Sequence, residues 1–242
     1  MIVFSDFDGT ITHDNRELTS QFFDIMKLIG RHQSELVIVS GRSISWGHFF
    51  LTHFPQLKAA IMEGGGVILT KDERGEIIED LTIDPFEVQR LFEFTDKLKD
   101  HFPNIPLSVD SFGRKTDRAI EFNLMNEEAL EDVFVFMKEH DINYTKSNVH
   151  VNFWCGEISK YKGVEKFLKD FRPLDKASDC LFFGDAPNDE SMFQFFENSV
   201  GVSNIKHCLS RLSYKPKTIL EGDENASANG VYNYLLRHYE ET

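Results

Sequence analysis

The chain has 242 residues, of which 41% are hydrophobic and 27% are charged. This composition is that of a folded globular protein and excludes a disordered or collagen-like chain, and the length allows one large domain or one and a half. The formal net charge is −14. Because such a surface repels nucleic-acid backbones and anionic lipid, we expect neither nucleic acid nor a membrane as a partner.

The cysteine content and the N-terminal segment indicate a cytoplasmic protein. The chain has three cysteines, Cys155, Cys180 and Cys208, whose spacing matches no zinc pattern. An odd number suits a reducing compartment better than a disulfide framework. The first residues lack the basic segment of a secretion signal, and no apolar run is long enough for a membrane-spanning helix. The sequence does not predict an oligomeric state.

The first 81 residues alternate short apolar runs with helical periods. Residues 1–7 predict a buried strand that ends in a turn at Asp8-Gly9-Thr10, and apolar positions from Leu18 to Ile29 recur with the spacing of one helix face. Further short apolar runs follow at 36–39 and 59–62. This alternation is typical of βαβ units, so we expect a parallel sheet covered by helices on both faces.

The pattern changes between residues 82 and 156, where short amphipathic strands alternate with two helical periods. The expected elements are a helix within 84–101, strands at 106–112 and 118–125, a helix through 130–137, and strands at 142–146 and 149–155. An antiparallel αββαββ unit of this size is too small to share a core with a parallel sheet. We therefore predict an inserted α+β domain at 82–156.

The α/β pattern returns at 157–242. Residues 164–171 predict a helix, Cys180–Phe183 a buried strand, and 199–202 a further short strand before a final helix. Residues 1–81 and 157–242 together predict a Rossmann-like, parallel-sheet α/β core.

Polar residues follow the predicted core strands at the points where these strands end. Asp6 and Asp8 follow the first strand, Ser40-Gly41-Arg42 follows the second, and Asp185 and Asp189 follow the strand at 180–183. In open α/β sheets, ligands bind outside the carboxyl ends of the strands. Several carboxylates meeting there would repel one another, and Mg²⁺ with oxygen ligands is their simplest stabiliser.

These residues resemble the motifs of the haloacid dehalogenase-like phosphatase superfamily. Asp6–Thr10 is similar to its first motif, Ser40 to its second, a lysine after the insert to its third, and Gly184–Asp189 to its fourth. The insert resembles the type II subclass B cap. Such caps occur in sucrose-phosphate, trehalose-phosphate and mannosyl-phosphoglycerate phosphatases, in Cof-like hydrolases and in phosphomannomutases. The resemblance covers essentially the whole chain.

The resemblance implies a role for each matching residue. Asp6 would be the nucleophile that forms an aspartyl-phosphate, and Asp8 would be the general acid and base. The expected Mg²⁺ ligands are Asp6, the Asp8 backbone carbonyl, Asp185 and Asp189, the last either as a ligand or as an anchor beside the site. The expected phosphate-binding groups are Ser40, Gly41, Lys160 and Asn188.

Two positions depart from the family pattern. The third motif ends in Gly163-Val164 if Lys160 is its lysine, with Tyr161 where glycine is usual, whereas a simple Lys-Gly pair selects Lys162. We predict Lys160. In the run Glu63–Gly66, Gly64 stands where the family often has asparagine.

The resemblance predicts a Mg²⁺-dependent phosphatase acting on a small phosphorylated metabolite, with a sugar phosphate favoured because caps of this kind occur in sugar-phosphate phosphatases. A cap of this size also excludes bulk water and folded proteins, so the substrate should be small. Two alternatives stay open at this point: a phosphomannomutase-like phosphotransferase, and a non-catalytic receiver-like or sugar-phosphate-binding module. Candidate substrate contacts, which can equally be ordinary surface or core residues, are Arg42, Arg114, Lys115, His150, Asn152 and Trp154.

Overall fold

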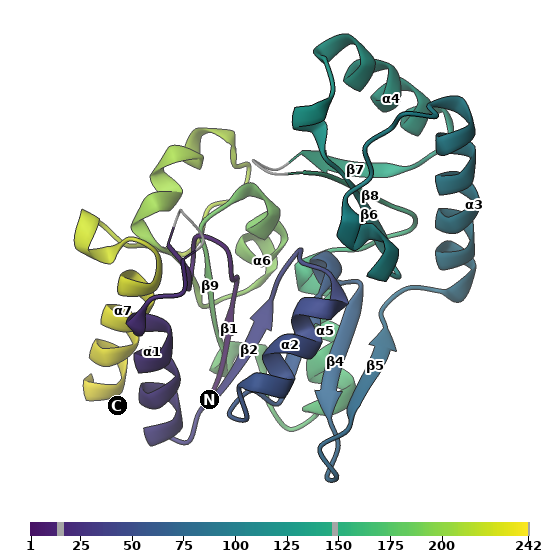
Figure 1. Ribbon diagram of the computed structural model, residues 1–242. Coiled ribbons are helices and arrows are strands. Elements are labelled where there is room, and N and C mark those ends of the chain that lie inside the picture. The colour runs from purple at the N-terminus through teal and green to yellow at the C-terminus, as the bar shows by residue number, and fades with distance from the viewer. Residues whose placement is uncertain (14–16, 147–149, 242) are drawn as a thin grey trace.

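The computed structural model describes residues 1–13, 17–146 and 150–241. It has two lobes: a larger α/β core that contains both ends of the chain, and a smaller lobe formed by the middle of the sequence (Figure 1). None of the helices in these described ranges has the length and apolar character needed to cross a bilayer.

The core is built on an eight-stranded sheet in the order β11-β10-β9-β1-β2-β3-β4-β5. Its strands are β1 (Ile2–Ser5), β2 (Glu35–Val39), β3 (Ala59–Met62), β4 (Val67–Lys71), β5 (Ile77–Leu81), β9 (Leu181–Gly184), β10 (Ser199–Gly201) and β11 (Thr218–Ile219). The strands from β11 to β3 are parallel, as the sequence predicts, and β4 and β5 extend the sheet antiparallel. The polar segments that follow β1, β2 and β9 therefore meet at one edge.

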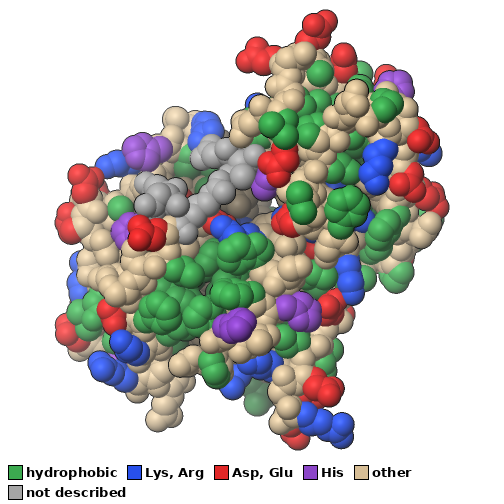
Figure 2. All heavy atoms as spheres, in the orientation of Figure 1, with side chains coloured by type: hydrophobic (Ala, Val, Ile, Leu, Met, Phe, Trp, Pro, Cys, Tyr) green, Lys and Arg blue, Asp and Glu red, His purple; other side chains and the backbone are tan. Residues whose placement is uncertain are grey.

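Helices cover both faces of this sheet because its strands are apolar on both sides. Val3 belongs to one hydrophobic cluster and Phe4 to the other, as the alternation along a strand requires. The first cluster includes residues of α1 (Ser20–Arg31), α2 (Ile44–His53) and α7 (Ser227–Glu241), and the second includes residues of α5 (Lys160–Phe171) and α6 (Glu190–Phe195). Figure 2 shows apolar side chains gathered on one face of the core. Two aromatic residues of the core helices, Phe23 of α1 and Phe49 of α2, are exposed.

The smaller lobe has its own antiparallel sheet and its own hydrophobic core. The sheet runs in the order β6-β8-β7, with β6 at Asp117–Ile120, β7 at Asn143–Lys146 and β8 at Val151–Trp154. The helices α3 (Pro85–His101) and α4 (Glu127–Glu139) pack on it and bury a separate cluster that contains Leu91, Val133 and Phe153 (Figure 1). This lobe is the α+β unit that the middle of the sequence predicts.

One predicted strand of this lobe is wrong. Instead of a strand at 106–112, the described chain makes a single bridge between Leu107 and Ile120 and then a 3-10 turn at Val109–Gly113. The physical reason is Ser111, whose hydroxyl donates to the Ala119 carbonyl at 3.1 Å and accepts from the Ala119 amide at 2.9 Å. A side chain thus takes the place of a backbone partner, and the strand expected at 118–125 ends at Ile120.

Candidate active site

Asp6 lies at the carboxyl end of β1, in the middle of the core sheet. The four residues of β1 are all buried, and the Asp6 amide continues the hydrogen-bond ladder by donating to the Phe183 carbonyl at 2.9 Å. The Asp6 side chain is only 3% exposed. A strand that is apolar on both faces therefore delivers a buried carboxylate to the edge where the other polar segments end.

Lys160 contacts two of the predicted site carboxylates. It is the first residue of α5 and is buried, and its Nζ donates to Asp6 Oδ1 at 2.6 Å and to Asp189 Oδ1 at 2.7 Å. Lys162 is about half exposed and pairs with Glu157 instead. The structure thus brings Lys160, and not Lys162, to the carboxylates.

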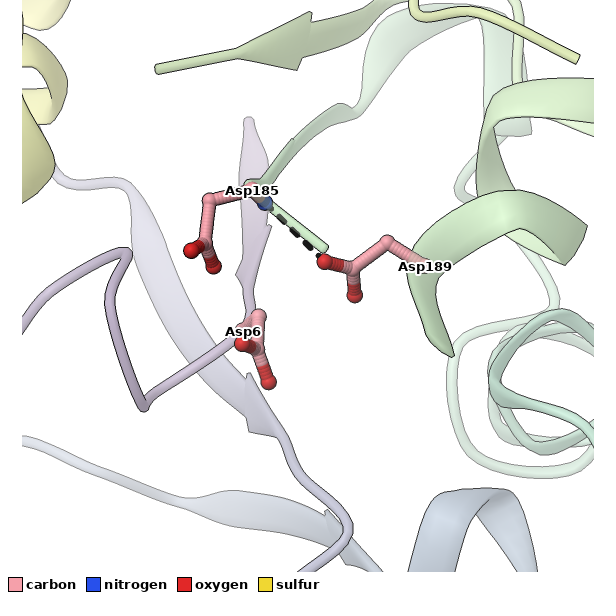
Figure 3. Close-up of side chains that lie close together, drawn as sticks. All are labelled: Asp6, Asp185 and Asp189. Atoms are coloured by element: carbon pink, nitrogen blue, oxygen red, sulfur yellow. Dashed lines mark hydrogen bonds between the residues drawn. The ribbon is translucent and has the colours of Figure 1, made fainter. Parts of the chain in front are cut away.

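Three carboxylates converge beside this lysine. Asp6, Asp185 and Asp189 each offer an oxygen within 4.8 Å of the others (Figure 3). Asp189 is held by its other oxygen, which accepts from the Asp185 amide at 3.0 Å and the Ala186 amide at 3.1 Å. Asp189 therefore closes the turn that follows β9 and fixes the backbone of Asp185.

Asp185 is oriented by two further side chains. Thr10 Oγ1 donates to Asp185 Oδ1 at 2.8 Å, and Asn204 Nδ2 donates to Asp185 Oδ2 at 3.0 Å and also to the Gly9 carbonyl at 3.0 Å. Asn204 is a residue that the sequence analysis missed. It follows β10 (Ser199–Gly201), so the rule of strand ends would have found it.

The pKa shifts show how costly this cluster of negative charge is. Burial raises the pKa of Asp6 to about 7; the nearby Lys160 opposes the shift, and Asp189 and Asp8 add to it. Burial, followed by repulsion from Asp6 and Asp189, raises the pKa of Asp185 well above its ordinary value. The single positive charge of Lys160 does not compensate for the negative charge of these carboxylates.

This donor set fits a hard divalent cation. Carboxylate and carbonyl oxygens are the ligands that such ions take, and a cation would remove the repulsion that raises the two pKa values. Asp6 and Asp185 are the carboxylates best placed to hold it. One oxygen of Asp189 accepts from two backbone amides and the other from the Lys160 ammonium, whereas the oxygens of Asp185 accept from the neutral side chains of Thr10 and Asn204. This difference favours the alternative role of Asp189 as an anchor.

Arg42 lies against Asp8. Its Nε donates to Asp8 Oδ2 at 2.7 Å and its Nη2 to Oδ1 at 2.5 Å, while the guanidinium stacks over the Trp46 ring at 3.8 Å. Such a two-point contact fixes the plane of the carboxylate. Arg42, expected from the sequence as a substrate contact, is here a partner of Asp8.

The loop after β2 carries the predicted phosphate-binding groups. Ser40 is 1% exposed, its amide donates to the Ile61 carbonyl at 2.8 Å, and its Oγ accepts from the Arg42 amide at 3.2 Å. Apart from its two chain neighbours, no described residue has an atom within 4 Å of the position that a Gly41 side chain would take. Asn188 is exposed in the 3-10 turn at Pro187–Asp189. The phosphate contacts themselves stay predictions.

The residues that the sequence analysis singled out in the smaller lobe have partners within the protein. Arg114 is 4% exposed, and Asn152 Nδ2 donates to Asp117 Oδ2 at 2.8 Å. The remaining candidates are Lys115, which is bonded to Glu79; His150, which is 3.0 Å from Glu121; and Trp154, which is partly buried on β8.

The sequence matches a family model over most of its length. Residues 3–113 and 116–235 match the model described as haloacid dehalogenase-like hydrolase. The chain belongs to this family. The motifs at Asp6–Thr10 and Gly184–Asp189 predict the same family, and that prediction is confirmed. No curated protein sequence matches the chain.

Solved structures of other proteins share the fold at low sequence identity. A Thermoplasma acidophilum protein is 15% identical with a TM-score of 0.72, and the match covers 100% of this chain and 98% of that one. The sucrose-phosphatase of Synechocystis sp., solved with sucrose and phosphate, is 13% identical with a TM-score of 0.71 and coverage of 99% and 98%. A Bacteroides thetaiotaomicron phosphatase of the haloalkanoate superfamily is 16% identical with a TM-score of 0.69 and coverage of 100% and 95%. At these identities the likeness establishes the fold of this family member.

Proposed function

We propose that this hydrolase is a Mg²⁺-dependent phosphatase that removes phosphate from a small metabolite, a sugar phosphate, through an aspartyl-phosphate. The observation that carries the proposal is the Asp6 carboxylate, buried at the end of β1, with Lys160 Nζ 2.6 Å away and Asp185 beside it. A nucleophile for phosphorus needs this combination of a fixed oxygen and nearby positive charge.

In the first step, an oxygen of Asp6 forms a bond to phosphorus while the bond from phosphorus to the departing sugar oxygen breaks. Asp8, two residues further along the chain, gives its proton to that oxygen. In the second step, a water molecule attacks the phosphorus of the aspartyl-phosphate, Asp8 takes its proton, and the bond to Asp6 breaks with release of inorganic phosphate. In this structure Arg42 donates to both oxygens of Asp8, so Asp8 takes up and gives these protons only when one of the two bonds is released.

The other site residues hold the phosphoryl group and its charge. Ser40, the Gly41 amide, Asn188 and Lys160 are the proposed donors to its oxygens. Bound Mg²⁺, held by Asp6, the Asp8 carbonyl and Asp185, supplies positive charge to the transferring group. The partly exposed face of β8, with Asn152 and Trp154, is the proposed wall for the sugar.

The sucrose-phosphatase of the same fold supports a sugar phosphate as the substrate class. The decisive experiment measures phosphate release by the purified protein from a panel of phosphorylated sugars and polyols with Mg²⁺. We expect release from at least one of them without a bisphosphate activator. A strict need for such an activator would instead indicate a phosphotransferase, and binding without any release would indicate a non-catalytic module.

Removing the metal ligand Asp185 should weaken the cation site. We expect Asp185→Asn to weaken Mg²⁺ binding by about tenfold or more, because one of the two best-placed carboxylates is lost. Calorimetric titration with Mg²⁺ measures this without any turnover. In wild type we also expect Mg²⁺ to raise the Tm, since the ion relieves the repulsion between the carboxylates. Excess chelator should abolish activity, because the transferring group then lacks the positive charge of the ion.

The matched control is Asp223→Asn, which changes a carboxylate that is 96% exposed and paired with Lys206. It should leave the Mg²⁺ titration and the Tm shift as in wild type. Equal Mg²⁺ affinity in Asp185→Asn and in wild type would contradict the assignment of Asp185 as a ligand.

A further inference from the structure

Glu63 occupies a backbone position that favours glycine. It follows β3 (Ala59–Met62), is 1% exposed, and has a φ of +54°, in the left-handed region. Residues with a side chain adopt this conformation at an energetic cost, and the next two residues, Gly64 and Gly65, are glycines. A charged side chain that is both strained and buried needs contacts that compensate for it.

The Glu63 carboxylate has those contacts, and most of them come from the smaller lobe. Thr116 donates to Glu63 Oε2 through both its amide and its Oγ1, each at 2.7 Å, and the Lys115 amide donates at 3.1 Å. The Ile44 amide, at the start of α2, lies 3.4 Å from Oε1. Three of these four contacts come from backbone amides, which can only donate, so the carboxyl oxygens accept them. Burial, followed by repulsion from Asp117, raises the pKa of Glu63 to about 7, and the bonds from Thr116 oppose that shift.

The backbone beside this carboxylate is bound to the proposed phosphate loop. The Glu63 amide donates to the Arg42 carbonyl at 3.0 Å, and the Gly64 amide donates to the Ser40 carbonyl at 3.0 Å. One residue therefore contacts the loop through its main chain and the smaller lobe through its side chain.

Arg114 makes a second contact between the smaller lobe and the phosphate loop. Its Nη1 donates to the Gly41 carbonyl at 3.1 Å and to Asp117 Oδ1 at 2.8 Å, so a buried arginine of the smaller lobe also ends on the phosphate loop. The lobes are in close contact here, because a side-chain carbon on Gly66 would lie 2.0 Å from Thr116 Oγ1.

The turn at 63–66 also contacts the helix that carries Lys160. A side-chain carbon on Gly65 would lie 2.0 Å from the Ser159 carbonyl and 3.1 Å from the Lys160 amide. The turn thus meets three parts of the proposed active site: the loop at 40–42, the start of α5, and the smaller lobe at Lys115 and Thr116.

We propose that Glu63 is a positioning residue that fixes the smaller lobe against the phosphate loop, so that both approach the substrate as one rigid unit. This inference rests on the proposed function for its catalytic consequence, but the contact itself is independent of any activity. Loss of the Glu63 contacts should misplace the lobe that receives the leaving group more than it disturbs the carboxylates.

The first test measures amide hydrogen exchange in full-length Glu63→Ala. Alanine has neither carboxylate oxygen, so the bonds to Lys115 and Thr116 are lost. We expect exchange of these two amides to become about tenfold faster or more. Unchanged exchange at both amides would overturn the proposal, whether or not the protein is a phosphatase.

Glu79→Ala is the matched control. Glu79 also binds the smaller lobe, through the Lys115 side chain, but it lies on β5 and is partly exposed. It should leave exchange at the Thr116 amide unchanged. Equal acceleration in both variants would also overturn the proposal, because it would indicate a general loosening of the lobe.

The second test separates positioning from a merely structural role. We expect Glu63→Ala to lower kcat/KM for the best sugar phosphate of the panel at least fivefold more than kcat/KM for p-nitrophenyl phosphate, a small aryl ester that depends less on the lobe. Thr116→Val should show the same bias more weakly, and the double variant should show less than the product of the single effects. Equal losses for both substrates would overturn the positioning role, whereas absence of turnover in wild type would reject only the proposed function.

Discussion

Asp6→Asn should abolish turnover while leaving the fold intact or more stable. An amide does not attack phosphorus, so we expect kcat to fall by about 10⁴-fold or more, as when other covalent enzymes lose their nucleophile. Burial raises the pKa of Asp6 to about 7, which means that its ionised form is disfavoured in the folded protein. A neutral asparagine removes this penalty, so in the absence of metal the Tm should be equal to or above that of wild type.

The measurements are phosphate release and thermal unfolding of the two proteins in chelator. Asp24→Asn, an exposed carboxylate paired with Lys27 on α1, is the control and should change neither quantity. Near-wild-type turnover by Asp6→Asn would contradict the nucleophile assignment. A large fall in Tm would instead mean that Asp6 stabilises the fold and that the loss of activity is indirect.

Lys160→Met should lower both activity and stability. The ammonium group is 1% exposed and holds Asp6 and Asp189 at 2.6 and 2.7 Å, so its removal leaves two buried carboxylates without their cation. Breaking a buried pair in this way costs about 3 kcal/mol or more of unfolding free energy. We also expect kcat to fall by about 10³-fold, because the nucleophile and the transferring group lose a fixed positive charge.

Lys162→Met is the natural comparison, since it removes a lysine two residues along the same helix. Lys162 is about half exposed and pairs with an exposed glutamate. Its loss should leave denaturant unfolding and kcat close to wild type. If Lys162→Met proved to be the inactive variant, the other alignment of the third motif would be correct.

The sequence predicts those parts of the fold and site that depend on local patterns. Short apolar runs predict the parallel strands, and the segments that end them predict where Asp6, Ser40 and Asp185 lie. Because all parallel strands have their carboxyl ends at the same edge of the sheet, the positions of the strand ends in the sequence are enough to predict that these residues lie together. The choice between Lys160 and Lys162 depends on where α5 begins, which the sequence left open.

The partners of these residues could not be predicted in this way. The strand-end rule places Asn204 at this edge of the sheet, but it does not predict that Asn204 bonds Gly9, 195 positions away, or that Glu63 bonds Thr116, 53 positions away. In the run Glu63–Gly66, the comparison with the family pattern indicates only the missing asparagine at Gly64. The residue that we propose to position the lobe is Glu63, directly before it. The sequence also does not show that the Ser111 hydroxyl bonds Ala119 in place of a backbone partner, because the alternation of residues there indicates a strand.

The smaller lobe has its own hydrophobic cluster, distinct from the two that enclose the core sheet. Substitutions at Leu91 or Phe153 would therefore repack the lobe without altering the side chains that enclose β1. Substitutions that change substrate preference can consequently accumulate in the smaller lobe without changing the residues that break the bond to phosphorus. A laboratory search for variants with a new specificity should randomise β8 and its supporting helices while keeping the strand that carries Asp6 constant.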